Sequence, residues 1–263
     1  MVKVGELDVY YEIHGDGFPL VMIMGLSGNI DWWDPRLIGE TSTRFNTVIF
    51  DNRGAGRTGK PKVTYTIDMF AEDTVGLMEA LKIKRAHILG ISMGGMIAQE
   101  LALNHPERVE RLVLCSTNCG ISHSIQPSQQ VLGLLMRPRG GMSEEEVAKN
   151  WISLLFTEDF VKNNPDLMSI VAPQILRNPI PADAYQRQMG AILNFDSYGR
   201  LPEIKAPTLV MQGRKDILVS PENAKIIADR IPGAKLLYFE NSGHALFSEE
   251  PEKVNQALLD FLK

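Results

Sequence analysis

The stretch Gly90-Ile91-Ser92-Met93-Gly94-Gly95 is the most informative part of this sequence about the fold. It follows the apolar run 86–89 and fits the pattern G-x-S-x-G, in which a serine stands on a tight turn between a strand and a helix. A serine at the tip of so sharp a turn has a strained backbone, and the flanking glycines let neighbouring chain pass close by. Residues 94–104 are predicted to form the helix, which Pro106 ends. Its N-terminal amides and positive dipole end would point at the serine oxygen.

Strand-like apolar runs alternate with helix-like segments through most of the chain. Residues 2–4 and 7–14 are predicted to be strands around a short turn, which would form an antiparallel hairpin. The later apolar runs lie at residues 20–24, 47–50, 86–89, 112–114, 208–211 and 235–239. Because these runs are unbroken, they suit strands that helices cover on both faces. The alternation predicts the α/β class, with a mostly parallel central sheet flanked by helices.

Residues 119–199 interrupt this alternation and show no strand signal. They are predicted to form several short helices separated by prolines, one of them with a capping box between Ser143 and Glu146. A helical insertion between two strands of a sheet most simply forms a cap over one edge. We therefore expect residues 1–118 and 200–263 to make the two parts of an α/β core, and residues 119–199 to make the cap.

Composition and charge argue against several classes of function. The chain has 263 residues, 44% of them apolar, which is enough for one substantial core. A net charge of −5 and the lack of a basic run argue against nucleic-acid binding. Residues 1–6 lack the apolar segment of a secretory signal, and no apolar stretch approaches the ~18–20 residues that span a bilayer. The sequence therefore predicts a cytoplasmic protein without a membrane partner.

Ser92 needs a base that a third group orients, because a serine hydroxyl is a weak nucleophile. His244 lies just past the carboxyl end of the last predicted strand, where catalytic groups gather in open α/β sheets. Asp216 follows the strand at 208–211 at the same edge, and a buried carboxylate there would orient the imidazole. We predict Ser92 as nucleophile, His244 as base and Asp216 as acid. Three other histidines are predicted to lie away from that edge, and we therefore do not assign them as the base: His14, His87 and His105.

Negative charge that develops on the substrate needs backbone N–H donors, each contributing about 3 kcal/mol. One donor is expected from Met93, the residue after the nucleophile. The second is expected from the turn 25–28 after the strand at 20–24, and we assign it to Leu26.

No metal or organic cofactor is expected. Residues 54–59 satisfy G-x-G-x-x-G, but Lys60-Pro61-Lys62 follows in place of the helix that a dinucleotide site requires. Cys115 and Cys119 lack the further ligands or the C-x-x-C spacing of a metal or redox site, so they are interpreted as reduced thiols in or near the core.

Together these motifs resemble the α/β-hydrolase superfamily over essentially the whole chain. The matching segments are 24–26 with Trp33, 51–58, 90–95, 213–216 and 242–244. The order Ser92, Asp216, His244 is the family's order as well. The chain is most similar to small bacterial esterases, enol-lactonases and non-haem peroxidase-like hydrolases with helical caps. It departs from the family at Thr58, where serine is usual, and at Met24, where many members carry histidine.

The resemblance implies a serine hydrolase that cleaves an ester or lactone bond of a small, largely apolar substrate through an acyl-enzyme on Ser92. In that family residues 51–58 form a structural turn. Carbon–carbon bond hydrolysis and perhydrolysis use the same three residues, and a receptor of the same fold that turns over little or nothing is a different class. These alternatives stay open, as does the choice between monomer and homodimer.

The substrate pocket is expected between Ser92 and the cap. The residues predicted to bind substrate are Trp32, Trp33, His123, Trp151 and Leu218. Cap arginines are a further source of contacts if the substrate carries a carboxylate, although a solvent-exposed role is expected for each: Arg137, Arg139, Arg177 and Arg187.

Overall fold

A seven-stranded sheet runs through the centre of the molecule, in the computed structural model that describes residues 1–137 and 141–263. Its strand order is β3-β5-β4-β6-β7-β8-β9, and β1 and β2 form a separate two-stranded sheet. Neighbours in the large sheet are parallel except β3 and β5. The strands are β1 Val2–Val4, β2 Leu7–Val9, β3 Tyr11–His14, β4 Phe18–Ile23, β5 Phe45–Phe50, β6 Ala86–Ile91, β7 Val109–Cys115, β8 Thr208–Gly213 and β9 Lys235–Phe239.

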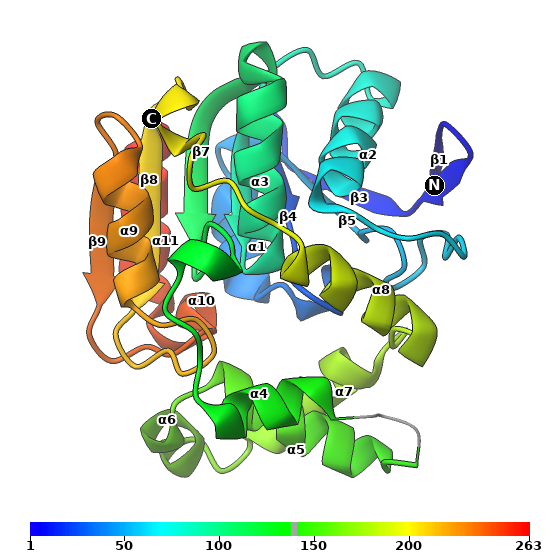
Figure 1. Ribbon diagram of the computed structural model, residues 1–263, viewed down its shortest axis with the longest axis vertical. Coiled ribbons are helices and arrows are strands. Elements are labelled where there is room, and N and C mark those ends of the chain that lie inside the picture. Colours follow the sequence, from blue (N-terminus) through cyan, green and yellow to red (C-terminus); the bar gives the residue numbers. More distant parts are fainter. Residues whose placement is uncertain (138–140) are drawn as a thin grey trace.

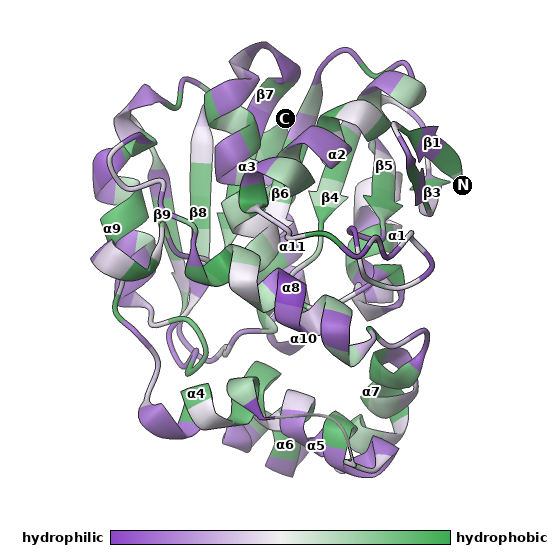
Figure 2. Ribbon diagram, turned by 45° about the vertical axis from the view of Figure 1, so that its right-hand side comes forward, coloured by the Kyte–Doolittle hydropathy of each residue, from purple (hydrophilic) through white to green (hydrophobic). Residues whose placement is uncertain are grey.

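Helices cover both faces of the large sheet, which confirms the predicted α/β class (Figure 1). The core helices are α1 Pro35–Ser42, α2 Ile67–Ala80, α3 Met93–Asn104, α9 Glu222–Arg230, α10 Leu246–Glu249 and α11 Pro251–Leu262. Alternate strand residues enter opposite layers: Val21 packs in the layer of α2, α3 and α9, whereas Leu20 and Met22 pack in the layer of α1 and α11. Figure 2 accordingly shows the central strands as mainly hydrophobic.

The N-terminal strand is divided at Tyr10. Its backbone N–H donates to Thr58 Oγ1 at 2.9 Å, and its carbonyl oxygen accepts from Asp51 N at 3.0 Å. Tyr10 therefore bonds to the segment that follows β5, and residues 11–14 then pair with β5. The predicted hairpin is confirmed for residues 2–9, but its continuation to residue 14 is wrong, because those residues form an edge strand of the large sheet.

Between β7 and β8 the chain forms helices that lie beyond the carboxyl ends of the strands (Figure 1). They are α4 Gln129–Met136, α5 Glu144–Leu155, α6 Glu158–Asn163, α7 Leu167–Leu176 and α8 Ala182–Leu193. The predicted capping box starts α5: Glu146 N donates to Ser143 Oγ, and Ser143 N donates to Glu146 Oε2. These helices share their own hydrophobic cluster. In the two described ranges, no helix combines the length and apolar character that crossing a membrane requires.

His87 lies buried near the start of β6, at the opposite end of that strand from Ser92. Its ring centroid is 4.8 Å from that of Phe18 and 5.5 Å from that of Phe45. Its Nδ1 has no hydrogen-bond partner within residues 1–137 and 141–263. Burial, which disfavours the charged imidazolium, lowers the pKa of His87 to about 4.

This buried histidine should make the protein less stable in acid. The unfolded histidine has a pKa of about 6.5, so between that pH and the folded value the unfolded state binds more protons and stability falls as pH falls. We expect His87 to account for a loss of about 2 kcal/mol of unfolding free energy between about pH 7 and about pH 5. Urea denaturation of wild type and His87→Leu at both values measures this. A stability difference between the two proteins that does not change with pH contradicts the prediction.

Candidate active site

Ser92 occupies the tight turn between β6 and α3 in a strained backbone conformation, with φ 57° and ψ −122°. A Cβ atom on Gly90 would lie 2.1 Å from Gly94 O, and one on Gly94 would lie 2.1 Å from Ile23 O. Neither position therefore accepts a larger residue without backbone movement. Ser92 N donates to Cys115 O at 2.9 Å, and Thr117 Oγ1 donates to Ser92 O at 2.7 Å. The sequence-predicted turn is thus held on both sides.

Asp216 and His244 meet in the protein interior. His244 Nδ1 lies 2.8 Å from Asp216 Oδ2, and each residue is only 4% exposed. Three further donors fix the carboxylate: the backbone N–H groups of Leu218 and Val219 bind Oδ1 at 2.9 Å, and Gln212 Nε2 binds Oδ2 at 2.9 Å. The two residues that the sequence singled out are therefore in contact, with the imidazole oriented by a carboxylate whose own position is fixed.

Gln212 supports Asp216, although no sequence motif points to this residue. It is the fifth residue of β8 and fully buried. Its signal in the sequence is a single amide directly after the apolar run 208–211, next to the loop that carries Asp216. A buried amide must find hydrogen-bond partners, and here one partner is the Asp216 carboxylate.

The loop after β4 passes directly beside Ser92. A Cβ atom on Gly25 would lie 2.9 Å from Ser92 Cβ and 3.5 Å from Ser92 Oγ. The N–H groups of Leu26 and Met93 are the predicted oxyanion donors. Within the described part of the chain, neither donates to another protein atom. No protein acceptor in this part of the chain therefore occupies either amide, and their role as donors to an oxyanion stays a prediction.

A cavity of about 150 Å³ joins these elements, and both Ser92 and His244 line it. Its other walls are mostly apolar side chains from the core and the cap, including Met24, Leu26, Trp32, Met93, Met96, Trp151, Leu155, Met189, Ile192 and Leu218. Its described lining contains no aspartate, glutamate, lysine or arginine. The arrangement combines an oriented imidazole, a strained serine and backbone N–H groups in one apolar space, which is suited to nucleophilic attack on a neutral carbonyl.

Comparison with known proteins agrees with this architecture. A family model described as "alpha/beta hydrolase fold" matches residues 19–251. The chain belongs to the alpha/beta hydrolase fold family. The resemblance predicted from the sequence is confirmed.

Relatives of this alpha/beta hydrolase carry different names. This chain is 30% identical to a protein of Caulobacter segnis named "Putative carbamate hydrolase RutD", over 100% of this chain and 99% of the relative. The enol-lactonase from Burkholderia xenovorans LB400 matches with a TM-score of 0.85 and 26% identity, over 98% of both chains. A thermophilic esterase from Thermogutta terrifontis matches with a TM-score of 0.82 and 26% identity, over 99% of this chain and 95% of that chain. The fold and the hydrolase family are shared, whereas the substrate names differ.

Three of the five residues predicted to bind substrate line the cavity of this hydrolase: Trp32, Trp151 and Leu218. The prediction for Trp33 needs correction, because Trp33 packs in the layer of α1 and α11, edge-to-face on Phe247 at 6.5 Å. Trp32, in the turn at residues 30–32, packs against the cap instead. The centroid of its ring lies 5.2 Å from that of Trp151.

His123 also lies outside the cavity lining. Its ring stacks on Tyr198 with centroids 3.9 Å apart and planes 11° apart, so the structure does not bring it to the cavity, and its binding of substrate stays a prediction. The cap arginines in the described residues point elsewhere too. Arg177 pairs with Asp31, and Arg187 pairs with Asp183. Arg137 lies at the end of α4 and does not line the cavity, and Arg139 lies outside the described residues.

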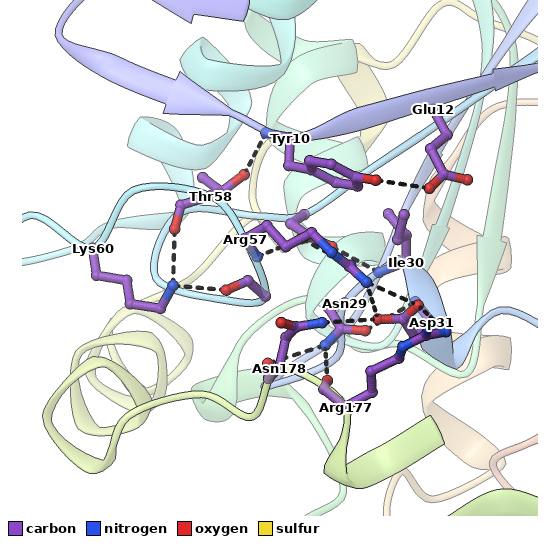
Figure 3. Close-up of polar contacts among 12 residues, drawn as sticks. Tyr10, Glu12, Asn29, Ile30, Asp31, Arg57, Thr58, Lys60, Arg177 and Asn178 are labelled. Carbon is purple, nitrogen blue, oxygen red and sulfur yellow. Dashed lines mark hydrogen bonds and ion pairs between the residues drawn. The ribbon is translucent and has the colours of Figure 1, made fainter. Parts of the chain in front are cut away.

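The glycine-rich segment 54–59 serves contacts within the chain. A Cβ atom on Gly56 would lie 2.1 Å from Asp51 Oδ2, and this carboxylate accepts from Ile30 N at 2.8 Å and Arg57 N at 2.6 Å. Burial raises the pKa of Asp51. Figure 3 shows Arg57 reaching from this loop to Asp31, at 2.9 Å. The segment 51–59 thus holds the segment after β4 through these contacts with Ile30 and Asp31. This agrees with the structural turn that the resemblance implies.

Glu249 links the His244 loop to the cap. It accepts from the backbone N–H and the hydroxyl of Thr157, both at 2.8 Å, and from the N–H of Gly243. Burial raises the pKa of Glu249. The sequence alone does not mark Glu249, because an acidic residue before a helix is usually a solvated one. Cys115 and Cys119 are free and buried, as predicted.

Proposed function

We propose that this alpha/beta hydrolase is a serine hydrolase that cleaves an ester or lactone bond of a small, neutral, largely apolar substrate. One observation above all supports this: His244, whose Nδ1 contacts the buried Asp216 carboxylate, lines the same apolar cavity as Ser92 on its strained turn. The names of the similar enol-lactonase and esterase support the choice of substrate class.

The proposed mechanism has two halves. Ser92 Oγ attacks the carbonyl carbon and gives its proton to His244 Nε2, while Asp216 stabilises the imidazolium through Nδ1–H. The Leu26 and Met93 N–H groups bind the oxyanion. His244 then protonates the leaving oxygen. The alcohol of an ester departs, whereas a lactone ring opens and keeps the new hydroxyl on its acyl chain; an acyl-enzyme remains in either case. In the second half a water gives its proton to His244 and attacks the acyl carbon, and the acid leaves as Ser92 recovers a proton.

The cavity limits the acyl group. A volume of about 150 Å³ is of the order that holds one benzene molecule. A charged acyl group would find no counter-ion in the described lining and would lose its hydration. We therefore expect neutral acyl groups from about acetyl to about hexanoyl or benzoyl size.

The proposal is tested with p-nitrophenyl esters from acetate to decanoate, simple lactones and a neutral alkyl carbamate. We expect ester turnover with an optimum at short chains, and covalent labelling of Ser92 by a fluorophosphonate, located by peptide mass spectrometry. Turnover of the carbamate alone would overturn the ester and lactone assignment. Failure of both turnover and labelling would overturn the serine mechanism and favour a binding protein.

Leu155 is expected to set the chain-length limit. It lines the Ser92 cavity and also two larger outer cavities, of about 780 and about 670 Å³. Leu155→Ala removes the side chain between these spaces, so we expect the optimum to lengthen by about two to three carbons, the size of the deleted group. The matched control is Leu237→Ala, at an exposed leucine of β9. Ratios of kcat/KM across the ester series measure the shift, and an unchanged profile contradicts the prediction.

A further inference from the structure

The oxyanion loop, residues 24–28, lacks the histidine that many family members carry before its glycine, because Met24 stands there. Met24 has no hydrogen-bonding hydrogen on its side chain, and it lines the cavity. Other groups must therefore hold the loop. Asn52 Nδ2 donates to Met24 O at 2.8 Å, and Gly28 N donates to Gly25 O at 3.3 Å. These two bonds fix the ends of the loop but leave Ser27 between them.

Ser27 has a positive φ of 67°, a conformation that residues with a side chain rarely adopt. Such a conformation persists only where surrounding contacts impose it. Ser27 N donates to Gln188 Oε1 at 2.8 Å. This N–H belongs to the peptide that follows Leu26, next to the peptide that carries the predicted oxyanion donor. A bond at this point therefore restrains the direction of the Leu26 N–H.

Gln188 comes from the cap, on α8, and it is fully buried. Its Nε2 donates to Arg53 O at 2.9 Å, in the loop after β5. One side-chain amide thus spans two core loops, with its oxygen on the oxyanion loop and its nitrogen on the neighbouring loop. Because both ends of the amide are engaged, its orientation is fixed.

The cap contacts the same segment a second time at Asn29. Asn29 Nδ2 donates to Arg177 O at 2.8 Å and to Asn178 O at 3.2 Å (Figure 3). Arg177 and Asn178 lie between α7 and α8. The cap therefore holds the segment after β4 from two places, and the bond nearer to the predicted donor comes from Gln188.

We propose that Gln188 is a positioning residue that holds the oxyanion loop from the cap and so directs the Leu26 N–H toward the developing oxyanion. This inference rests on the proposed function. It means that the cap contributes to transition-state stabilisation in addition to enclosing substrate.

The test compares Gln188→Met with Asn223→Leu. Methionine keeps the approximate volume of glutamine but can form neither bond. Asn223 is a matched control: it is a buried amide that also joins core to cap by two bonds, accepting from Ile125 N at 2.7 Å and donating to Ile125 O at 2.9 Å. A purely structural role predicts similar effects of both substitutions. A positioning role predicts that only Gln188→Met impairs the transition state.

We expect Gln188→Met to lower kcat on p-nitrophenyl butyrate by about 10- to 100-fold, less than the 10²–10³-fold typical of losing an oxyanion donor outright, with KM within about two-fold. Butylboronic acid, which forms a tetrahedral adduct with the serine, should bind more weakly by the same factor as kcat/KM falls. Asn223→Leu should leave both unchanged. Equal losses in the two variants, or a loss of kcat without weaker boronate binding, overturn the positioning role.

Gln188→Glu provides a second variant that does not depend on the first one folding well. A protonated glutamic acid can accept from Ser27 N–H and donate to Arg53 O as glutamine does, whereas the carboxylate cannot donate and opposes a nearby oxyanion. We expect its kcat, divided by the wild-type kcat at the same pH, to rise as pH is lowered. A ratio that does not change with pH overturns the inference. A wild type without turnover or Ser92 labelling overturns the proposed function, and this inference with it.

Discussion

Ser92→Ala is expected to lower kcat by about 10⁶-fold, the loss found when the nucleophile of a Ser-His-Asp hydrolase is removed. Without the hydroxyl no acyl-enzyme forms, and the oriented imidazole has no oxygen to activate. The change deletes one oxygen from a side chain that faces the cavity, so it removes no core volume. The backbone of Ser92 keeps its bonds to Cys115 and Thr117, and stability should therefore change little.

Turnover of p-nitrophenyl butyrate, labelling by a fluorophosphonate and the thermal unfolding midpoint measure these effects. The control is Ser169→Ala, at an exposed serine of α7 whose hydroxyl donates to the nearby Asp166 O. It should keep wild-type turnover and labelling. Turnover by Ser92→Ala within tenfold of wild type would show that another group performs the attack.

Asp216→Asn is expected to lower kcat by about 10⁴-fold, as the corresponding change does in a serine protease. The reason lies in the donors around the carboxylate. Leu218 N and Val219 N both bind Oδ1, so the oxygen of an asparagine would take that position. Its NH₂ group would then face Gln212 Nε2 and His244 Nδ1. An NH₂ group donates, so His244 Nδ1 becomes an acceptor and its proton moves to Nε2, which then cannot accept the serine proton.

The control for this substitution is Asp229→Asn, at an exposed residue of α9 paired with Lys225. It should leave kcat unchanged. Steady-state kinetics over the ester series measures both variants, and KM should change much less than kcat in Asp216→Asn because the carboxylate does not line the cavity. A loss of less than about tenfold would point to another acid, and Glu249, which contacts the loop before His244, would be the next residue to replace.

The residues of the candidate site differ in how far they could be predicted. Ser92, Asp216 and His244 could be named because each lies in the turn or loop just after a predicted strand, and parallel strands end at one edge. The residues that support them could not. Gln212 and Gln188 are each a single amide in the sequence, and their partners are set by the packing of distant segments; Gln188 binds Ser27, 161 positions away.

The cap could also be predicted only in part: its helices could be predicted from the sequence, but its substrate contacts could not. Separating prolines and the lack of a strand signal predicted its helices, and the Ser143–Glu146 capping box could be predicted because it is a local pattern. Which apolar side chains face Ser92 could not be predicted. Trp32 and Trp33 are adjacent and chemically identical, yet one lines the cavity and the other packs on Phe247. His123 stacks on Tyr198, a neighbour that only the return of the chain from the cap provides.

The α/β class, the strained serine turn and the order of the predicted catalytic residues could be predicted from the amino-acid sequence, because they depend on steric limits, hydrogen bonds and periodicity within a few residues. The tertiary structure alone decided where β3 pairs, which aromatic rings enclose the cavity and how the cap reaches the oxyanion loop through Gln188. These features depend on groups far apart in the chain, and a buried polar side chain takes as partner whichever donor or acceptor the packed core places beside it.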